Sequence, residues 1–100
     1  ISALRNVQVR TIKMAADDGN LVELLHYKSH LREPKDRCIC DTGYSHIAFT
    51  VESLDFEYAR LKEEGVKFNC APQVSPDSKA KVAFCYDCAG NLIELVEELT

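Results

Sequence analysis

A seven-residue segment that occurs twice constrains the fold of this chain most strongly. The two copies are residues 19–25 (GNLVELL) and residues 90–96 (GNLIELV), seventy-one positions apart. Each copy starts with a Gly-Asn pair, which is typical of a turn, and continues as a short apolar run, which is typical of a β-strand. The repeat therefore predicts two related structural units in one chain.

Each copy of the repeat carries one carboxylate in the middle of its apolar run, Glu23 in the first and Glu94 in the second. Carboxylates are rarely buried in an apolar strand unless they are paired or bind a metal. Because the two residues occupy matching positions, we expect both side chains to point into one shared site.

Hydrophobic periodicity predicts a mixed chain of the α+β class. We expect strands at residues 7–14, 21–27, 45–51, 66–70, 81–86 and 92–97, a helix at 54–64, and a surface loop at 71–80. The helix is indicated by Leu54, Tyr58 and Leu61 at helical spacing and by Gly65 at its end. From residue 44 onward the expected order is β-α-β-β-β.

The repeat divides the chain into three expected parts. Residues 1–27 correspond to the C-terminal strands of a first module, residues 28–43 form a polar connector, and residues 44–100 form a complete second module. The chain starts with Ile1, and its first module lacks an expected strand and helix. We therefore expect either a longer protein or a second chain that supplies the missing surface.

Composition narrows the classes of partner. The formal net charge of −4 argues against nucleic acid, which requires a clustered basic surface. No apolar run approaches the roughly 20 residues of a membrane helix. Five cysteines and the lack of a signal-peptide pattern favour reduced thiols and a cytoplasmic protein. A zinc site built from the Cys38-x-Cys40 and Cys85-x-x-Cys88 pairs is a less favoured alternative, because Cys85 falls within an expected strand.

Several segments together resemble the vicinal oxygen chelate superfamily. They are residues 43–51 (GYSHIAFTV), the helix that ends at Gly65, residues 82–87 (VAFCYD), residues 90–95, and residues 19–27. That family includes glyoxalase I, methylmalonyl-CoA epimerase, ring-cleaving dioxygenases and bleomycin-resistance proteins. The resemblance implies βαβββ modules of the glyoxalase/dioxygenase type that form a cupped mixed sheet around a divalent metal, with the first module incomplete here.

The resemblance also implies a set of metal ligands. His46 comes from the first strand of the second module, Glu94 from its last strand, and Glu23 from the last strand of the first module. The fourth ligand has no counterpart in this sequence. Such ligands suit Zn, Ni, Co, Mn or Fe without distinguishing among them. Taken alone, His46 has the alternative interpretation of a core histidine bonded to a backbone carbonyl.

The function implied is a metal-dependent lyase or isomerase of glyoxalase I type, in which Glu94 moves a proton between adjacent carbons. The expected substrate is a small molecule, a thiohemiacetal of methylglyoxal, and the expected assembly is a homodimer. Three alternatives stay open: an enzyme like methylmalonyl-CoA epimerase, a non-catalytic small-molecule binding or resistance module, and an extradiol-type dioxygenase. His26 and His30 are expected to be surface residues outside the site.

Overall fold

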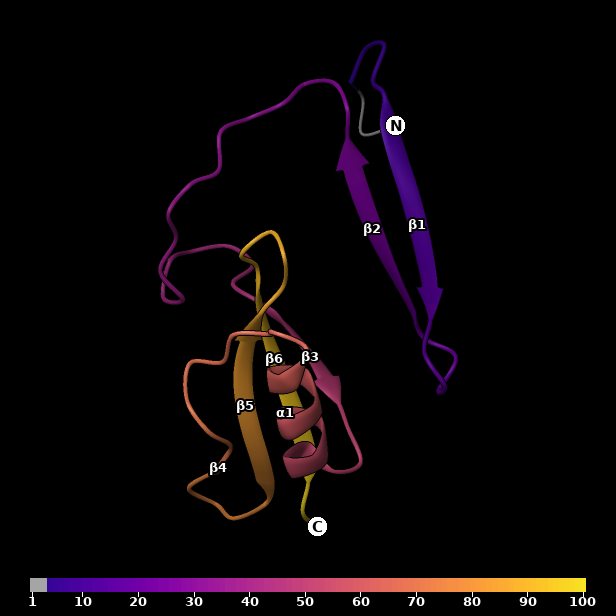
Figure 1. The fold of residues 1–100 in the computed structure, drawn as a ribbon. Coiled ribbons are helices and arrows are strands. Elements are labelled where there is room, and N and C mark those ends of the chain that lie inside the picture. Colours follow the sequence, from indigo (N-terminus) through magenta and orange to yellow (C-terminus); the bar gives the residue numbers. More distant parts are fainter. Residues whose placement is uncertain (1–3) are drawn as a thin grey trace. The chain divides into compact units, whose positions relative to one another are not determined.

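The computed structural model describes residues 4–100 and divides the chain into two compact units, Ile1–Asp36 and Arg37–Thr100 (Figure 1). Unit 1 holds β1 (Val9–Ala15) and β2 (Leu21–Tyr27). Unit 2 holds β3 (Ile47–Thr50), α1 (Leu54–Glu63), β4 (Gln73–Val74), β5 (Ala80–Tyr86) and β6 (Leu92–Glu98). The predicted α+β class is confirmed, and unit 2 has the predicted β-α-β-β-β order. No helix within residues 4–100 is long and apolar enough to span a bilayer.

Unit 1 is an antiparallel hairpin whose tight turn joins β1 to β2. The Gly19 N–H donates to the carbonyl of Ala16, and Gly19 has a φ of 89°, which favours glycine. The side chain of Asp18 accepts from the backbone N–H and from the side-chain amide of Asn20, both at 2.9 Å. The Gly-Asn pair is therefore used as the sequence predicts, since glycine allows the turn and asparagine is held by an aspartate.

The turn between β5 and β6 repeats this construction. Gly90 has a φ of 85° and donates to the carbonyl of Asp87. The carboxylate of Asp87 accepts from the backbone N–H of Asn91 at 2.7 Å and from its side-chain amide at 2.9 Å. Burial raises the pKa of Asp87, but the hydrogen bonds from Asn91 and the neighbouring backbone outweigh it and lower the pKa overall. The repeat in sequence is thus also a repeat in backbone structure.

The sheet of unit 2 is mixed and has the strand order β3-β6-β5-β4. β3 runs parallel to β6, and the other neighbouring pairs are antiparallel. Figure 1 shows α1 lying across one face of this sheet. The buried core beneath the helix consists of Leu54, Ala83, Cys85 and Leu95. Leu54 is fully buried, and it therefore joins the start of the helix to the sheet.

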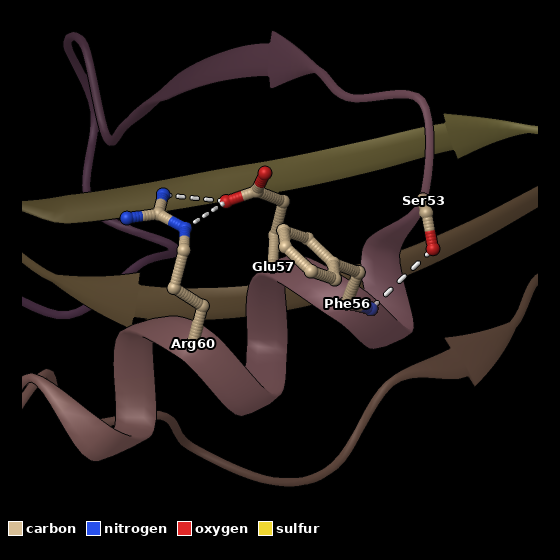
Figure 2. A network of polar contacts seen from close by, with 4 residues as sticks. All are labelled: Ser53, Phe56, Glu57 and Arg60. Atoms are coloured by element: carbon tan, nitrogen blue, oxygen red, sulfur yellow. Dashed lines mark hydrogen bonds and ion pairs between the residues drawn. The ribbon is translucent and has the colours of Figure 1, made fainter.

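Two side chains satisfy the backbone at the start of α1. Ser53 is the N-cap, and its Oγ accepts from the N–H of Phe56 at 3.4 Å (Figure 2). From β6, Glu97 Oε1 accepts from the N–H of Leu54 at 2.7 Å. Glu57 and Arg60 form an ion pair one turn further along, which Figure 2 also shows. The helix is therefore fixed at its start by a carboxylate from the sheet as well as by its own cap.

We expect Glu97→Ala to lower the free energy of unfolding by about 1–2 kcal/mol, because the N–H of Leu54 loses a charged acceptor in a half-buried position. Ser53→Ala should lower it by less, about 0.5 kcal/mol, because the bond from Phe56 is long. Urea unfolding measures both changes. Glu97→Gln keeps an acceptor and serves as the matched control. An effect of Ser53→Ala larger than that of Glu97→Ala would contradict this assignment.

The predicted strand at residues 66–70 is wrong. Phe68 forms only an isolated bridge with Cys85, and the regular pairing resumes at β4, within the segment predicted as a loop. The Asn69 N–H donates to the carbonyl of Phe84, but the chain then reaches Pro72, which has no N–H to donate. The edge of the sheet is therefore formed by two short pieces instead of one strand.

Candidate active site on the open face of the sheet

Alternation along β5 and β6 separates the sheet of unit 2 into two faces. Ala83, Cys85 and Leu95 belong to the core under α1. Their neighbours Phe84 and Glu94 are paired in the sheet register and therefore point to the opposite, open face. The open face carries the candidate site.

His46 and Glu94 meet on this open face. His46 Nε2 lies 3.0 Å from Glu94 Oε1, and the exposed fractions of the two side chains are 25% and 21%. The ring of His46 also packs edge-on against Phe84, with 5.3 Å between ring centroids. Ser45 Oγ lies 2.7 Å from the other ring nitrogen, Nδ1. The arrangement is a hydroxyl, an imidazole and a carboxylate joined in series by hydrogen bonds.

The donor set suits a divalent transition metal. Imidazole nitrogen and carboxylate oxygen are ligands of such ions, and a histidine ligand commonly has a hydrogen-bonding partner on its second nitrogen, here Ser45. Within Arg37–Thr100, His46 and Glu94 form a pair of donors, and no group of three His, Cys, Asp or Glu side chains is gathered. Unit 2 by itself therefore offers two metal-binding side chains.

Glu23, the third predicted ligand, lies on β2 of unit 1. It is exposed there and stands opposite Lys13 in the register of the hairpin. His26 stands opposite Arg10, on the other face of the hairpin from Glu23, and is exposed. His30 is exposed as well. The participation of Glu23 in the site of His46 and Glu94 stays a prediction.

Two residues in contact with His46, Ser45 and Phe84, are not among the predicted site residues. A signal for Phe84 exists in the sequence, because strand alternation places it on the same face as Glu94. No such signal marks Ser45, since the same Ser-His dipeptide recurs as Ser29-His30 in unit 1, away from any predicted ligand.

An open pocket of about 570 Å³ lies elsewhere in unit 2, between the end of α1 and the β5–β6 turn. Its lining includes Val66, Lys67, Tyr86, Asp87 and Cys88. The carboxylate of Asp87 is already used by the N–H groups of the turn. We place the candidate site at His46 and Glu94 because a base and a metal-binding nitrogen converge there.

Cys85 leads to a prediction of how the stability of the fold depends on pH. Burial, together with the negative charge of Asp87, raises the pKa of the Cys85 thiol above its ordinary value of 9.0. The unfolded chain then loses this proton at lower pH than the folded protein does. We therefore expect stability to be lost as the pH rises above about 9, with a smaller loss in Cys85→Val. Thermal unfolding at about pH 8 and about pH 10 measures the effect. Cys70→Ser changes an exposed thiol and should keep the wild-type pH dependence.

Comparisons with known proteins bear on the whole chain. A glyoxalase family protein from Bacillus cereus is similar in structure with a TM-score of 0.82 and 25% identity, covering 99% of this chain and 68% of that chain. A glyoxylase/bleomycin resistance protein/dioxygenase domain from Frankia sp. EAN1pec has a TM-score of 0.73 and 21% identity, covering 94% of this chain and 68% of that chain. A glyoxalase family protein from Enterococcus faecalis has a TM-score of 0.62 and 22% identity, covering 92% of this chain and 79% of that chain.

A search among curated proteins finds no match to the sequence. The family model of the Glyoxalase/Bleomycin resistance protein/Dioxygenase superfamily matches residues 5–95, which span both units and include Glu23, His46 and Glu94. The expected resemblance is thereby confirmed, and this chain belongs to the Glyoxalase/Bleomycin resistance protein/Dioxygenase superfamily.

Proposed function

We propose that this chain is a metal-dependent lyase or isomerase of glyoxalase I type. It would move a proton between adjacent carbons of a small substrate that carries two neighbouring oxygens, such as a thiohemiacetal of methylglyoxal. The observation that supports this proposal is the pairing of His46 Nε2 with Glu94 Oε1 at 3.0 Å on the open face of the sheet. A base next to a metal-binding nitrogen is the combination that this chemistry requires.

Glu94 is the residue that we assign to proton transfer. Its Oε1 is engaged by His46, whereas its Oε2 has no hydrogen-bond partner among residues 4–100. The side chain is 21% exposed, so a substrate carbon acid can approach the second oxygen. Phe84, the register partner of Glu94 on β5, places an apolar side chain on the same face beside it. Glu94 would take a proton from one carbon and return it to the next.

The metal ion that we propose would be held by His46 and Glu94, with Glu23 as a third ligand. When bound, a divalent ion supplies positive charge that stabilises negative charge developing on the substrate oxygens. The ligand types do not distinguish among Zn, Ni, Co, Mn and Fe. A homodimer and a cytoplasmic location belong to the same proposal.

Assays of the purified chain loaded separately with each metal test the proposal. We expect turnover of methylglyoxal with glutathione in at least one metal form, and loss of that turnover after chelation. Epimerisation of 2-methylmalonyl-CoA without glyoxalase turnover would replace the proposal with the epimerase alternative. Oxygen uptake with catechols would replace it with a dioxygenase. Tight binding of a small molecule in a form that turns over none of these substrates would indicate a sequestering module.

A further inference from the structure

The histidine of the candidate site has a hydrogen-bond partner on each ring nitrogen. Ser45 Oγ lies 2.7 Å from Nδ1 of His46, and Glu94 Oε1 lies 3.0 Å from Nε2. Phe84 meets the ring edge-on. The imidazole is thus contacted at three places, and the Ser45 hydroxyl is the hydrogen-bond partner of Nδ1.

The chemistry of these partners decides which nitrogen carries the proton of a neutral His46. An ionised carboxylate only accepts hydrogen bonds, so Nε2–H donates to Glu94 and Nδ1 is left as an acceptor. The hydroxyl of Ser45 therefore donates to Nδ1 in this arrangement. If Nε2 instead binds a metal, Nδ1 must carry the proton, and the same hydroxyl then accepts a hydrogen bond from Nδ1–H.

A hydroxyl suits both arrangements because it can donate as well as accept. A backbone carbonyl or a carboxylate at the same place only accepts, and it would favour the Nδ1–H form alone. The residue type at position 45 therefore matters when His46 Nε2 changes its partner from Glu94 to a metal ion. The side chain at this position must be able both to donate and to accept a hydrogen bond.

We propose that Ser45 is a positioning residue that keeps Nε2 of His46 aimed at Glu94 in the metal-free protein and available to a metal ion. This inference rests on the proposed function, because it concerns the histidine that we assign to the metal. Ser45 acts through His46. Without its hydroxyl, Nδ1 loses its hydrogen-bond partner, and only the contacts with Glu94 and Phe84 restrain the ring.

The chain contains a natural comparison for this contact. Ser29 Oγ lies 2.8 Å from Nδ1 of His30, in the same sequence order of serine and histidine. Ser29 Oγ also accepts from the N–H of Gln8 at 2.7 Å. Within residues 4–100, however, His30 has no carboxylate partner. The Ser29–His30 pair therefore reproduces the local contact without the third member of the series, and it provides a matched control.

Nuclear magnetic resonance of the metal-free protein tests the proposal, because relaxation of the ring carbons reports motion of the imidazole and two-bond proton–nitrogen spectra report its protonated nitrogen. We expect a rigid ring in the Nε2–H form in the wild type and the same form with a more mobile ring in Ser45→Ala, since Glu94 still accepts from Nε2–H. Ser45→Thr keeps the hydroxyl and should restore the rigid ring. Ser45→Cys keeps the size but donates only weakly, so it should resemble Ser45→Ala. Ser29→Ala should leave the signals of His46 unchanged.

Zinc binding gives a second readout that separates this inference from the proposed function. Ser45→Ala should lower the affinity for Zn²⁺ by about 10-fold, as the loss of a partner behind a ligand histidine commonly does, and Ser45→Thr should restore it. If the wild type binds no metal, the proposed function fails, and the mobility of the His46 ring still decides the role of Ser45. Unchanged ring mobility in both Ser45→Ala and Ser45→Cys would overturn the proposal.

Discussion

Replacement of Glu94 with Gln is expected to lower turnover by about 10²- to 10⁴-fold, the contribution of a positioned general base. Glutamine has nearly the same shape, and its carbonyl oxygen still accepts from Nε2–H of His46. The amide cannot take a proton from carbon at neutral pH. Because the side chain is partly exposed and keeps its partner, the fold should be unchanged. Steady-state kinetics with methylglyoxal and glutathione, together with circular dichroism, measure the two effects.

Two further variants show whether the loss is specific. Glu98→Gln changes an exposed carboxylate at the end of the same strand and should keep wild-type turnover. Glu23→Gln removes the predicted ligand from unit 1 and should weaken metal binding, as Glu94→Gln also should. Wild-type turnover and metal content in Glu94→Gln would exclude Glu94 from the site. A normal metal content in Glu23→Gln alone would remove only Glu23.

The sequence predicts the parts of the fold that depend on local chemistry. The repeated Gly-Asn pair predicts two turns, and both occur with the glycine at positive φ and the asparagine held by an aspartate. His46 and Glu94 are grouped by the family resemblance and not by local patterning, and in the structure the parallel register of Ala48 with Glu94 places the two residues on one face. Pro72 in the sequence also indicates an interruption of the strand pairing. That the edge of the sheet is formed by two short pieces depends on the residues of β5 that lie opposite.

The burial of the two glutamates is less predictable, because it depends on what covers each face. Each lies in the middle of an apolar run, yet Glu23 is exposed and Glu94 is partly buried. In unit 2 the neighbours of Glu94, Ile93 and Leu95, lie under α1. Leu24, which occupies the position of Leu95 in the first copy of the repeat, is 48% exposed within the described structure. The two copies of the repeat thus differ in burial because a helix packs against the second copy. The hydrophobic periodicity of a strand does not show whether a helix will pack against it.

The importance of the covering helix in unit 2 leads to the largest expected effect on stability. We expect Leu54→Ala to lower the free energy of unfolding by about 2–5 kcal/mol, the range for a leucine removed from a closed core. Leu54 is 0% exposed and belongs to the buried core between α1 and the sheet, so its replacement by alanine leaves a cavity among packed side chains. A loss of this size is a large share of the roughly 5–15 kcal/mol that stabilises a typical domain. Since the chain has no tryptophan, urea unfolding followed by far-ultraviolet circular dichroism is the suitable measurement.

A control on the same helix isolates burial from helix formation. Phe56 lies one half-turn beyond Leu54 and is 64% exposed, so Phe56→Ala should change stability by less than about 1 kcal/mol. Alanine favours the helix at both positions, so a difference between the two variants reports packing against the sheet. The loss of α1 would also uncover Ile93 and Leu95 on either side of Glu94 along β6. We therefore expect Leu54→Ala to reduce turnover only under conditions in which unit 2 unfolds, whereas Glu94→Gln reduces it in the folded protein. Equal stability of the two alanine variants would mean that α1 does not hold the sheet through Leu54.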